Sequence, residues 1–450
     1  MSEQRLHILL PTDVFPPRCG GAGWSAHALA LALIERGHAV TAVVPQQGGY
    51  GARREDVLGV PALRWGYRAP RIPFVQNYFR HERLWPQLAN VLVELAAVDQ
   101  QPPLGGGDRR SSVVGRRSSV VIHAQHVQTA PPAVMAGRRL GAPVVVTVRD
   151  HWPWDYFATG LHGDRLPYER QTWASLAADL PVRLGPTRGA LALPAIPYML
   201  AHLRRRQQFL HQADAVIAVS DYIARRLAGI VAPERLHVVP NMVDLAAIDA
   251  VIASPPANVA PDTAYLLYVG KLDRNKGAHL LVDIFREWQL AIGDSGDGNL
   301  QSTICNLQLV IAGSGPLQPD MERELAALGV SVRFLDWIDH DEVLRLMARC
   351  TLLLFPSAWG EPLSRVSLEG MACGAPILAM PTGGTPGTIA DGVTGALEPT
   401  PARFARRMAA LLARPEQRAA LGAAARRAAR ERYAKETVVG QVEALYESLR

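Results

Sequence analysis

Two glutamates in the last third of the chain have the spacing to serve one polar ligand. Glu361 follows a buried strand-like run, TLLLFP, and Glu369 lies eight residues on, in a helix that we expect to begin near Leu363. The free backbone N–H groups and the positive dipole end of that helix favour a phosphate. Carboxylates placed before and inside the helix can accept hydrogen bonds from sugar hydroxyls. The alternative is a helix-stabilising acid and a surface acid.

Two glycine-containing loops supply further phosphate-binding chemistry. In VGKLDRNKG, Lys271, Arg274 and Lys276 follow a strand and can neutralise a diphosphate, and the chain has three lysines in all. In PPRCGGAG, Gly20 and Gly21 precede a helical run, and glycines there let backbone amides approach a phosphate or a sugar. Each loop alone is a weak signal, because such loops serve many ligands.

Polar residues also follow two strand-like runs of the first half, VVIHAQH and PVVVTVRDHW. Ligands of parallel sheets bind beyond the carboxyl ends of strands, so chemistry is expected there. An ordinary loop or capping role is the alternative for most of these residues, which are His123, Gln125, His126, Arg149, Asp150 and His151.

The elements that position these residues alternate between strands and helices in both halves of the chain. Residues 5–45 read as strand, glycine loop, helix and strand, which opens a doubly wound α/β domain, and the pattern restarts at 265. We expect domains at 1–243 and 244–430, a hinge near 240–262, and a helix at 431–450 that packs back on the first domain. Residues 403–450 read as helical, broken near Pro415. Loops without regular structure are expected at 99–120 and 293–302.

Length and composition exclude several classes of protein. The 450 residues are 48% hydrophobic and 20% charged, which suits a globular chain of two or three domains and excludes a disordered or coiled-coil one. The sequence contains no signal peptide and no membrane span, so a cytoplasmic location is expected. Four distant cysteines argue against disulfides or a structural zinc site: Cys19, Cys305, Cys350 and Cys373.

The two halves of the chain differ in charge. Residues 1–240 carry 27 arginines and 17 acids, whereas residues 241–450 carry 20 bases and 24 acids. A basic first half suits an anionic partner such as a membrane surface, with a solvated arginine-rich surface as the alternative. Residues 189–210, which end in LAHLRRRQQFL, are the candidate for membrane contact, although two prolines oppose one continuous amphipathic helix. The alternative is a domain helix with a solvated basic face. No nucleic-acid recognition module is present.

Asp339 and Asp341 form an Asp-x-Asp pattern, which in some enzymes holds a divalent metal. Here the pattern precedes a helical run, EVLRLMARC, where acids favour the N-terminal end. We expect helix capping and no metal site, because lysines and a helix N-terminus already supply positive charge.

Taken together, these motifs resemble retaining glycosyltransferases of family 4, which have the GT-B fold of two Rossmann-like, doubly wound α/β domains facing across a cleft. The resemblance covers nearly the whole chain apart from the two expected loops. Ordered matches are also found at 218–227, 238–244 and 311–317. The family's glutamate pair matches Glu361 and Glu369, its glycine loop matches Gly20 and Gly21, and its phosphate-binding segment matches Gly270, Lys271, Leu272, Lys276 and Gly277.

The resemblance implies a role for each matched residue. The donor is a nucleotide-activated sugar whose diphosphate is held by Lys271 and Lys276, with Gly20 and Gly21 closing over it. Glu361 contacts the donor sugar and Glu369 the ribose, while Gly313 and Trp337 border the base. The donor-binding set is completed by Gly270, Leu363, Ser364 and Arg365. A hexosyl group is then transferred, with retained anomeric configuration, to a glycan, lipid-linked or small-molecule acceptor against the basic first domain. No cofactor or metal is expected.

The sequence departs from the family pattern at several positions. Where many members carry a catalytic histidine this chain has Gln125, with His126 beside it, and we take His126 as the candidate and Gln125 as the alternative. Ser364 and Met242 stand where glycine is frequent, and Gly387 where glutamate is frequent. Two other functions fit the same motifs: a nucleotide-sugar epimerase, or a nucleotide-sugar-binding subunit without turnover.

Overall fold

The structure is a computed structural model that describes residues 5–17, 19–72, 75–98, 120–160, 170–257, 264–293 and 307–450. Apart from Val120 and Gly293, the loops expected at 99–120 and 293–302 lie outside these residues, as does Cys305. The chain forms two compact units. Unit 1 contains the described residues within 1–159, 168–240 and 439–450, and unit 2 contains those within 160–167 and 241–438.

Unit 1 is built on an eight-stranded sheet of order β3-β4-β2-β1-β5-β6-β7-β8. Every neighbouring pair is parallel except β3 and β4, an antiparallel hairpin that the sequence did not lead us to expect. The strands are β1 (His7–Pro11), β2 (Ala39–Gln47), β3 (Gly51–Val57), β4 (Val60–Tyr67), β5 (Val120–Ala124), β6 (Val144–Val148), β7 (Ala215–Ala218) and β8 (Leu236–Val238).

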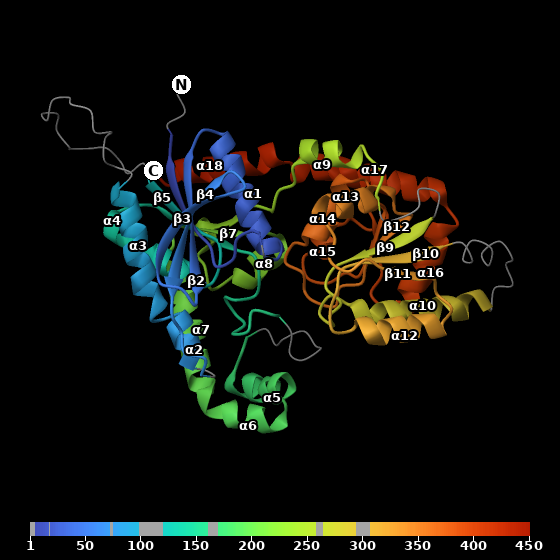
Figure 1. The fold of residues 1–450 in the computed structure, drawn as a ribbon, viewed down its shortest axis with the longest axis horizontal. Coiled ribbons are helices and arrows are strands. Elements are labelled where there is room, and N and C mark those ends of the chain that lie inside the picture. The colour runs from blue at the N-terminus through green and yellow to red at the C-terminus, as the bar shows by residue number, and fades with distance from the viewer. Residues whose placement is uncertain are drawn as a thin grey trace, which may run out of the picture. The chain divides into compact units, whose positions relative to one another are not determined.

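The helices of unit 1 connect these strands (Figure 1). They are α1 (Gly21–Glu35), α2 (Val75–Arg80), α3 (Leu84–Val98), α4 (Ala130–Leu140), α5 (Trp173–Leu184), α6 (Pro186–Ala192), α7 (Ile196–Gln212) and α8 (Asp221–Leu227). Because β1 pairs with β5 and β5 with β6, the residues that follow these three strands meet at one edge of the sheet. That edge carries Thr12, Gln125 and Arg149.

Unit 2 contains a six-stranded, wholly parallel sheet of order β11-β10-β9-β12-β13-β14. Its strands are β9 (Tyr265–Val269), β10 (Gln308–Ala312), β11 (Val332–Phe334), β12 (Leu352–Phe355), β13 (Ile377–Ala379) and β14 (Ala396–Leu397). The helices are α9 (Leu245–Ile252), α10 (Ala278–Gly293), α12 (Gln318–Ala327), α13 (His340–Arg349), α14 (Arg365–Ala372), α15 (Thr385–Thr388), α16 (Pro401–Leu412) and α17 (Pro415–Arg432). Its apolar core includes Tyr268, Phe285 and Phe404. The adjacency of β9 and β12 brings the two predicted donor-binding loops side by side.

The C-terminal helices break at Pro415, as expected, and a second time at Ala434. Ala434 forms a bridge with Val243, and Lys435 Nζ lies 2.7 Å from a carboxylate oxygen of Asp244. The last helix, α18 (Lys435–Ser448), then continues into unit 1, to which residues 439–450 belong. There Tyr446 is fully buried, and its hydroxyl lies 2.6 Å from Nδ1 of His123. The final helix is therefore shared between the two units.

Residues 189–210 are divided as their prolines suggest, but their basic face is not wholly solvated. The stretch contains the end of α6, a short 3-10 helix at Leu193–Ala195, and α7. Arg204 and Arg205 are exposed, whereas Arg206 is buried, so the expectation of a solvated face is wrong for Arg206. Among the described residues, no helix has both the length and the apolar character to cross a bilayer.

Candidate functional site

The loop after β9 packs against the side-chain hydroxyl of Tyr268, a residue of β9. The hydroxyl of Tyr268 donates to the carbonyl of Lys271 at 3.0 Å and lies 3.4 Å from that of Lys276, while Leu272 is fully buried. Gly277 has a φ of +71°, and a Cβ there would lie 1.7 Å from the carbonyl oxygen of Pro356. Only glycine fits at this position, where the loop passes against the segment after β12.

Lys276 and Glu361 form the centre of the site in unit 2. The ammonium nitrogen lies 2.5 Å from Glu361 Oε1 and 4.5 Å from the centre of the Trp359 ring. Ser357 Oγ donates to the same oxygen at 3.1 Å, and the Trp359 amide donates to the carbonyl of Asn275 at 2.8 Å. Glu361 is buried and its charge is compensated by Lys276, which makes this a preorganised ion pair.

Lys271 differs from Lys276 in its surroundings. Its side chain is exposed, and it forms no salt bridge within the part of the chain that the structure describes. It is an exposed point charge at the same loop, available to an anion without first leaving a salt-bridge partner.

Glu369 lies on the buried side of α14 and has cationic partners. Its Oε1 accepts from Arg365 Nη2 at 2.6 Å and Nε at 3.1 Å, and lies 3.0 Å from His340 Nε2. Burial favours the neutral acid, but Arg365 and His340 outweigh it, so the pKa of Glu369 falls below its usual value. The same hydrogen bond raises the pKa of His340. Glu369 is thus a buried carboxylate that is hydrogen-bonded to Arg365 and His340, and not the surface acid of the alternative interpretation.

The first turn of α14 follows directly from Glu361. The helix begins at Arg365, two residues after the expected start, and Ser364 is its N-cap, accepting from the amide of Ser367. Leu363 is buried beside this cap. The amides of Arg365 and Val366 belong to the set that a helix leaves without intrahelical partners. An anion can bind at this end of the helix.

Gly383 and Gly384 also shape the loop around Glu361. The amide of Gly384 donates to the carbonyl of Glu361 at 2.6 Å, and a Cβ on Gly383 would lie 2.5 Å from the Glu361 amide. The segment after β13 therefore packs directly against the backbone of Glu361. Gly313, with a φ of +143°, likewise follows β10, and a Cβ there would lie 2.1 Å from the carbonyl oxygen of Gly270.

The remaining predicted residues of unit 2 are placed as follows. Trp337 is 78% exposed and follows the bridge between Gly313 and Asp336. Asp339 caps α13 by accepting from the amide of Asp341 at 2.9 Å, which confirms the capping interpretation. Among the described residues, no group of three or more His, Cys, Asp or Glu side chains is arranged to hold a metal ion.

In unit 1, Gly20 and Gly21 form the start of α1. Gly20 is the N-cap residue of this 15-residue helix and provides no side-chain cap. A Cβ on Gly20 would meet nothing within 4 Å, so the space above the helix end is open. Backbone amides at this end are accessible to an anion.

His126 lies at the carboxyl edge of the unit 1 sheet and is buried. The Thr12 hydroxyl donates to the carbonyl of Val14 at 2.8 Å, so the 2.9 Å contact with His126 requires Nδ1–H to be the donor. This leaves Nε2 as a bare acceptor, and it has no hydrogen-bond partner among the described residues. Burial, with a contribution from the charge of Arg149, lowers the pKa of His126 to about 3. The neighbouring Gln125 donates to the carbonyl of His123 at 3.3 Å.

Two carboxyl groups at the same edge of the unit 1 sheet have raised pKa values. Asp13 Oδ2 accepts from the amide of Gln128 at 3.0 Å, and Asp150 Oδ1 accepts from the amide of Trp152 at 2.8 Å. Desolvation raises the pKa of Asp13 to about 7, with the charge of Asp150 adding to the rise, and burial raises the pKa of Asp150 to about 6. Asp13 was not predicted, although it lies two residues after the end of the buried strand β1.

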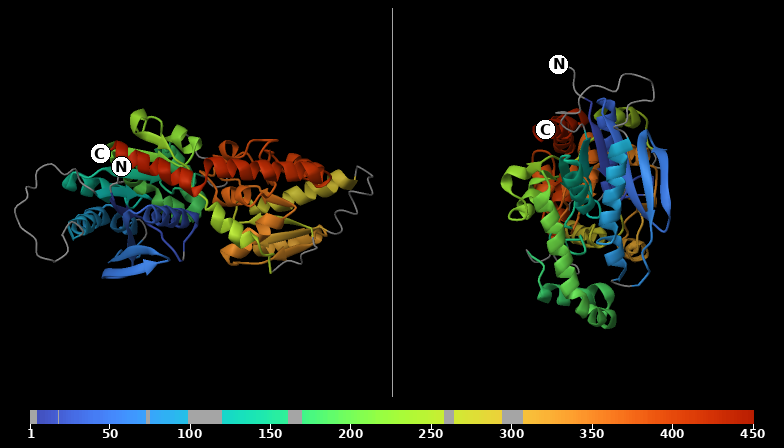
Figure 2. Two further views of the ribbon diagram at one scale, coloured as in Figure 1. Left: turned by 90° about the horizontal axis from the view of Figure 1, so that it is seen from above. Right: turned by 90° about the vertical axis from the view of Figure 1, so that its left-hand side faces the viewer.

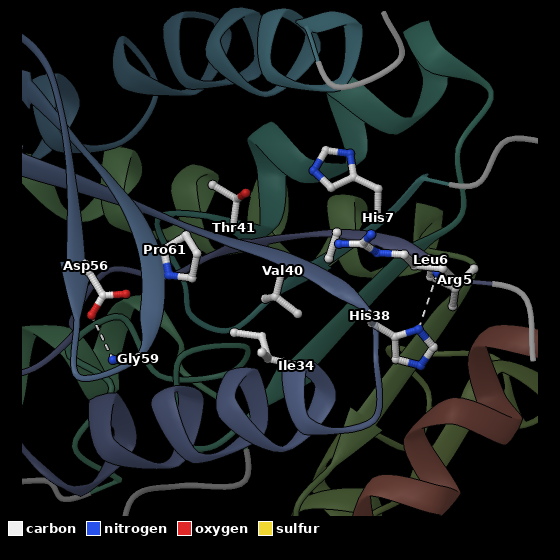
Figure 3. A pocket seen from close by; sticks show the side chains of 11 residues that line it. Arg5, Leu6, His7, Ile34, His38, Val40, Thr41, Asp56, Gly59 and Pro61 are labelled. Atoms are coloured by element: carbon white, nitrogen blue, oxygen red, sulfur yellow. Dashed lines mark hydrogen bonds between the residues drawn. The ribbon is translucent and has the colours of Figure 1, made fainter. Parts of the chain in front are cut away.

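Unit 1 also contains a pocket of about 640 Å³. Figure 3 shows the side chains that line it. Its lining comes from the beginnings of β1 and β2 and from the turn between β3 and β4, and includes Arg5, His7, His38 and Asp56. It therefore lies at the end of β1 opposite to Thr12 and Asp13. None of the predicted site residues lines it.

Other functional candidates in unit 2 were missed from the sequence. Ser357 and Trp359 contact the central ion pair, and His340 contacts Glu369. Their only signal was position, since Ser357 and Trp359 follow the end of β12 and His340 opens a helix. Sequence spacing does not reveal which helix end faces Glu369.

The fold of both units identifies the class of protein. Two α/β units in one chain, each built on a largely parallel sheet, match structures with the GT-B fold. The Anabaena protein HepE, solved in complex with UDP, matches over 98% of this chain and 100% of its own, with a TM-score of 0.65 at 17% identity. The model of glycosyltransferase family 4 matches residues 19–247, more than half of the chain, and that of group 1 glycosyl transferases matches residues 253–428. The chain belongs to glycosyltransferase family 4, which confirms both the predicted family and the predicted fold class.

Curated relatives match a shorter part of the chain. A D-inositol 3-phosphate glycosyltransferase from Actinosynnema mirum is 34% identical over 202 residues, covering 42% of this chain and 46% of its own. Spore coat protein SA from Bacillus subtilis is 30% identical over 198 residues, covering 41% and 49%. The chain thus spans about half the length of these curated relatives.

Proposed function

We propose that this protein transfers a hexosyl group from a nucleotide-activated sugar to a glycan, lipid-linked or small-molecule acceptor. The anomeric configuration is retained and no metal ion takes part. The observation that carries the proposal is the Lys276–Glu361 ion pair, formed at the carboxyl ends of β9 and β12 beside the open first turn of α14.

The proposed chemistry begins when Lys276 exchanges its partner Glu361 for the diphosphate of the donor. When a donor binds, its diphosphate takes Lys276 and Lys271 as counter-ions and meets the amides at the start of α14. Glu361, released from part of its pairing with Lys276, accepts hydrogen bonds from donor sugar hydroxyls. As the glycosidic bond breaks, charge builds on the leaving diphosphate, and these fixed positive groups stabilise it. This supply of positive charge is the support for metal independence.

The other predicted residues complete the donor and acceptor sites. Glu369 binds the ribose, with Gly313 and Trp337 at the base, and Gly20 and Gly21 approach the diphosphate. His126, neutral and with Nε2 unpaired, provides an acceptor for a hydroxyl group near the reacting carbon. Unit 1 also provides the acceptor side and a peripheral contact with an anionic membrane.

A ligand screen in the absence of metal tests the donor site. The purified chain is melted with UDP-, GDP-, ADP- and dTDP-sugars in EDTA, and one nucleotide is expected to raise the midpoint by several degrees. UDP is the first to test, because structures of HepE were solved with UDP and with UDP-glucose. No shift with any of the four would contradict the proposal.

Product analysis then separates the competing functions. With an acceptor array, NMR of the purified product is expected to show the anomeric configuration of the donor. Conversion of the donor without any acceptor indicates an epimerase instead. Donor binding with neither reaction indicates a subunit that binds but does not turn over.

A further inference from the structure

The indole ring of Trp359 is a second partner for the ammonium group of Lys276. The ammonium nitrogen lies 4.5 Å from the centre of this ring and 2.5 Å from Oε1 of Glu361. A cation within about 6 Å of the centre of an aromatic ring is attracted by the negative face of the ring, and indole attracts it best. Lys276 is therefore held by one charged group and by one uncharged group.

The position of Trp359 does not depend on the ion pair. The sheet of unit 2 has helices on both of its sides (Figures 1 and 2), and Lys276 and Trp359 lie in the loops that follow its neighbouring strands β9 and β12. The amide of Trp359 donates to the carbonyl of Asn275 at 2.8 Å, and Asn275 directly precedes Lys276. These backbone groups hold Trp359 beside Lys276 even when the side chains of Lys276 and Glu361 separate.

The two partners of Lys276 respond differently to an incoming diphosphate. The carboxylate of Glu361 repels a diphosphate and competes with it for the ammonium group. The indole ring has no net charge, so it attracts the cation without repelling the anion. The Lys276 side chain is 29% exposed and has a flexible four-carbon stem. Without the ring, an ammonium group released from Glu361 is free to swing into solvent.

We propose that Trp359 is a positioning residue of the donor site, which holds the ammonium group of Lys276 in place while its partner changes from Glu361 to the diphosphate. This role rests on the proposed function, because it takes a diphosphate as the ligand of Lys276. An aromatic face suits the role, since a second carboxylate would compete with the diphosphate and an aliphatic side chain has no negative face. The alternative is a packing role, which needs only a side chain of similar size.

The lysine signals of the full chain report this contact directly. The chain has three lysines, Lys271, Lys276 and Lys435, so isotope labelling of the lysine ε carbon gives three NMR signals, which single Lys→Arg variants assign. Protons above an aromatic ring resonate upfield. Without any ligand, we expect the ε protons of Lys276 upfield of those of the other two lysines. Trp359→Leu should abolish this shift, and Trp359→Phe should keep part of it.

Titration with UDP, GDP, ADP and dTDP in EDTA then tests the role in donor binding. The Lys276 signal of the wild type should stay upfield when a nucleotide binds. We expect Trp359→Leu to weaken the affinity for that nucleotide about fivefold, and Trp359→Phe to weaken it less than about twofold.

Fluorinated tryptophan tests the same role without removing a side chain. Growth on a difluorinated tryptophan leaves the shape of the ring nearly unchanged but weakens its negative face. Nucleotide affinity should therefore fall in the wild type by more than in Trp359→Phe, which retains the other eight of the nine tryptophans. This measurement decides between attraction and packing even if Trp359→Leu does not fold.

Trp173→Leu provides the matched control. Trp173 begins α5 in unit 1 and is 55% exposed, so its replacement should leave the lysine signals and the nucleotide affinity unchanged. Thermal melting establishes which variants are folded.

The role of Trp359 is overturned by any of three results. These are a Lys276 signal that is not upfield in the wild type, equal nucleotide affinity in Trp359→Leu, Trp359→Phe and the wild type or equal loss in both variants, and an effect of fluorination that is the same with and without Trp359. A different result identifies failure of the proposed function. If none of the four nucleotides moves a lysine signal of the wild type, the donor site itself is wrong, and the role of Trp359 falls with it.

Discussion

The ammonium nitrogen of Lys276 lies 2.5 Å from Oε1 of Glu361, although the two residues are 85 positions apart in the sequence. The pairing of β9 with β12 brings them together, and Gly277 permits the close approach because its missing Cβ leaves room for the Pro356 carbonyl. The two elements that carry the donor-binding motifs are therefore joined before any ligand arrives.

Replacing Lys276 and Lys271 separately distinguishes the effect of losing the ion pair with Glu361 from the effect of losing a positive charge. Lys276→Ala removes the counter-ion of a buried carboxylate and the proposed partner of the leaving group, so we expect transfer to fall by about 10²–10³-fold. Lys271→Ala is the matched variant: because Lys271 is exposed and forms no salt bridge within the described residues, donor affinity should fall while the melting temperature without donor stays unchanged. Transfer rates and melting curves measure both effects. A wild-type rate in Lys276→Ala contradicts the site.

The contact between His340 and Glu369 predicts a pH-dependent stability. The hydrogen bond that His340 donates to Glu369 raises the pKa of His340 in the folded protein, so the contribution of this contact to stability is fully present below the unfolded pKa of about 6.5. The contribution is lost as pH rises through the higher folded pKa. His340→Gln should therefore destabilise the protein by about 0.2–1 kcal/mol at pH 6, and by less at pH 9. Urea unfolding at the two pH values measures the difference. A larger loss at pH 9 contradicts the assignment.

Asp13 also predicts a stability that falls as pH rises, but here the substitution stabilises the protein. Its folded pKa of about 7 lies above the unfolded value of about 4, so the folded protein holds a proton that the unfolded chain releases. Stability is highest below the unfolded pKa and falls as pH rises through 7. Asp13→Asn keeps an acceptor for the Gln128 amide and should stabilise the protein by up to a few kcal/mol at pH 8, with no gain near pH 4. Denaturation midpoints of the wild type and of Asp13→Asn, measured from pH 4 to pH 8, provide the check. A difference between the two proteins that stays constant over this range contradicts the raised pKa of Asp13.

Arg206 predicts a large effect on folding from a residue outside the donor site. Its Nε donates to His202 Nε2 at 2.8 Å, which leaves His202 Nδ1–H to donate to Glu82 Oε1 at 2.6 Å. The guanidinium also reaches the carbonyl of Tyr156 at 3.3 Å, in the segment after β6. Arg206→Ala should cost about 3–5 kcal/mol of unfolding free energy.

The neighbouring Arg204 supplies the control for that measurement. It lies two residues earlier on α7 and is exposed, so Arg204→Ala should change the free energy of unfolding by no more than about 0.5 kcal/mol. Urea denaturation of both variants decides the matter. If both variants lose the same small amount of unfolding free energy, the buried hydrogen-bond network around Arg206 does not contribute to stability.

The local motifs could be predicted from the sequence because each consists of residues that lie close together along the chain. Gly270 to Gly277 follow an apolar run, and Glu361 precedes a capped helix, so strand, loop and helix could be placed without knowing the sheet order. The restart of the pattern at 265 likewise indicated two α/β domains.

The missed residues depend on contacts between distant segments. Ser357 and Trp359 matter because β12 lies beside β9, and His340 because the start of α13 faces α14. Arg206 is buried because backbone carbonyls after β6 accept from it. The raised pKa of Asp13 comes from desolvation by residues that the sequence separates widely. No local pattern encodes these relations.

The path of α18 also sets an order of events during protein synthesis. His123, near the first third of the chain, is hydrogen-bonded by Thr147 at 2.7 Å on one ring nitrogen and by Tyr446 at 2.6 Å on the other. While the ribosome is still making unit 2, the surface that Tyr446 later covers is bare. Unit 1 is translated first but completed last. A C-terminal tag or truncation on this chain will therefore act first on the stability of its N-terminal half.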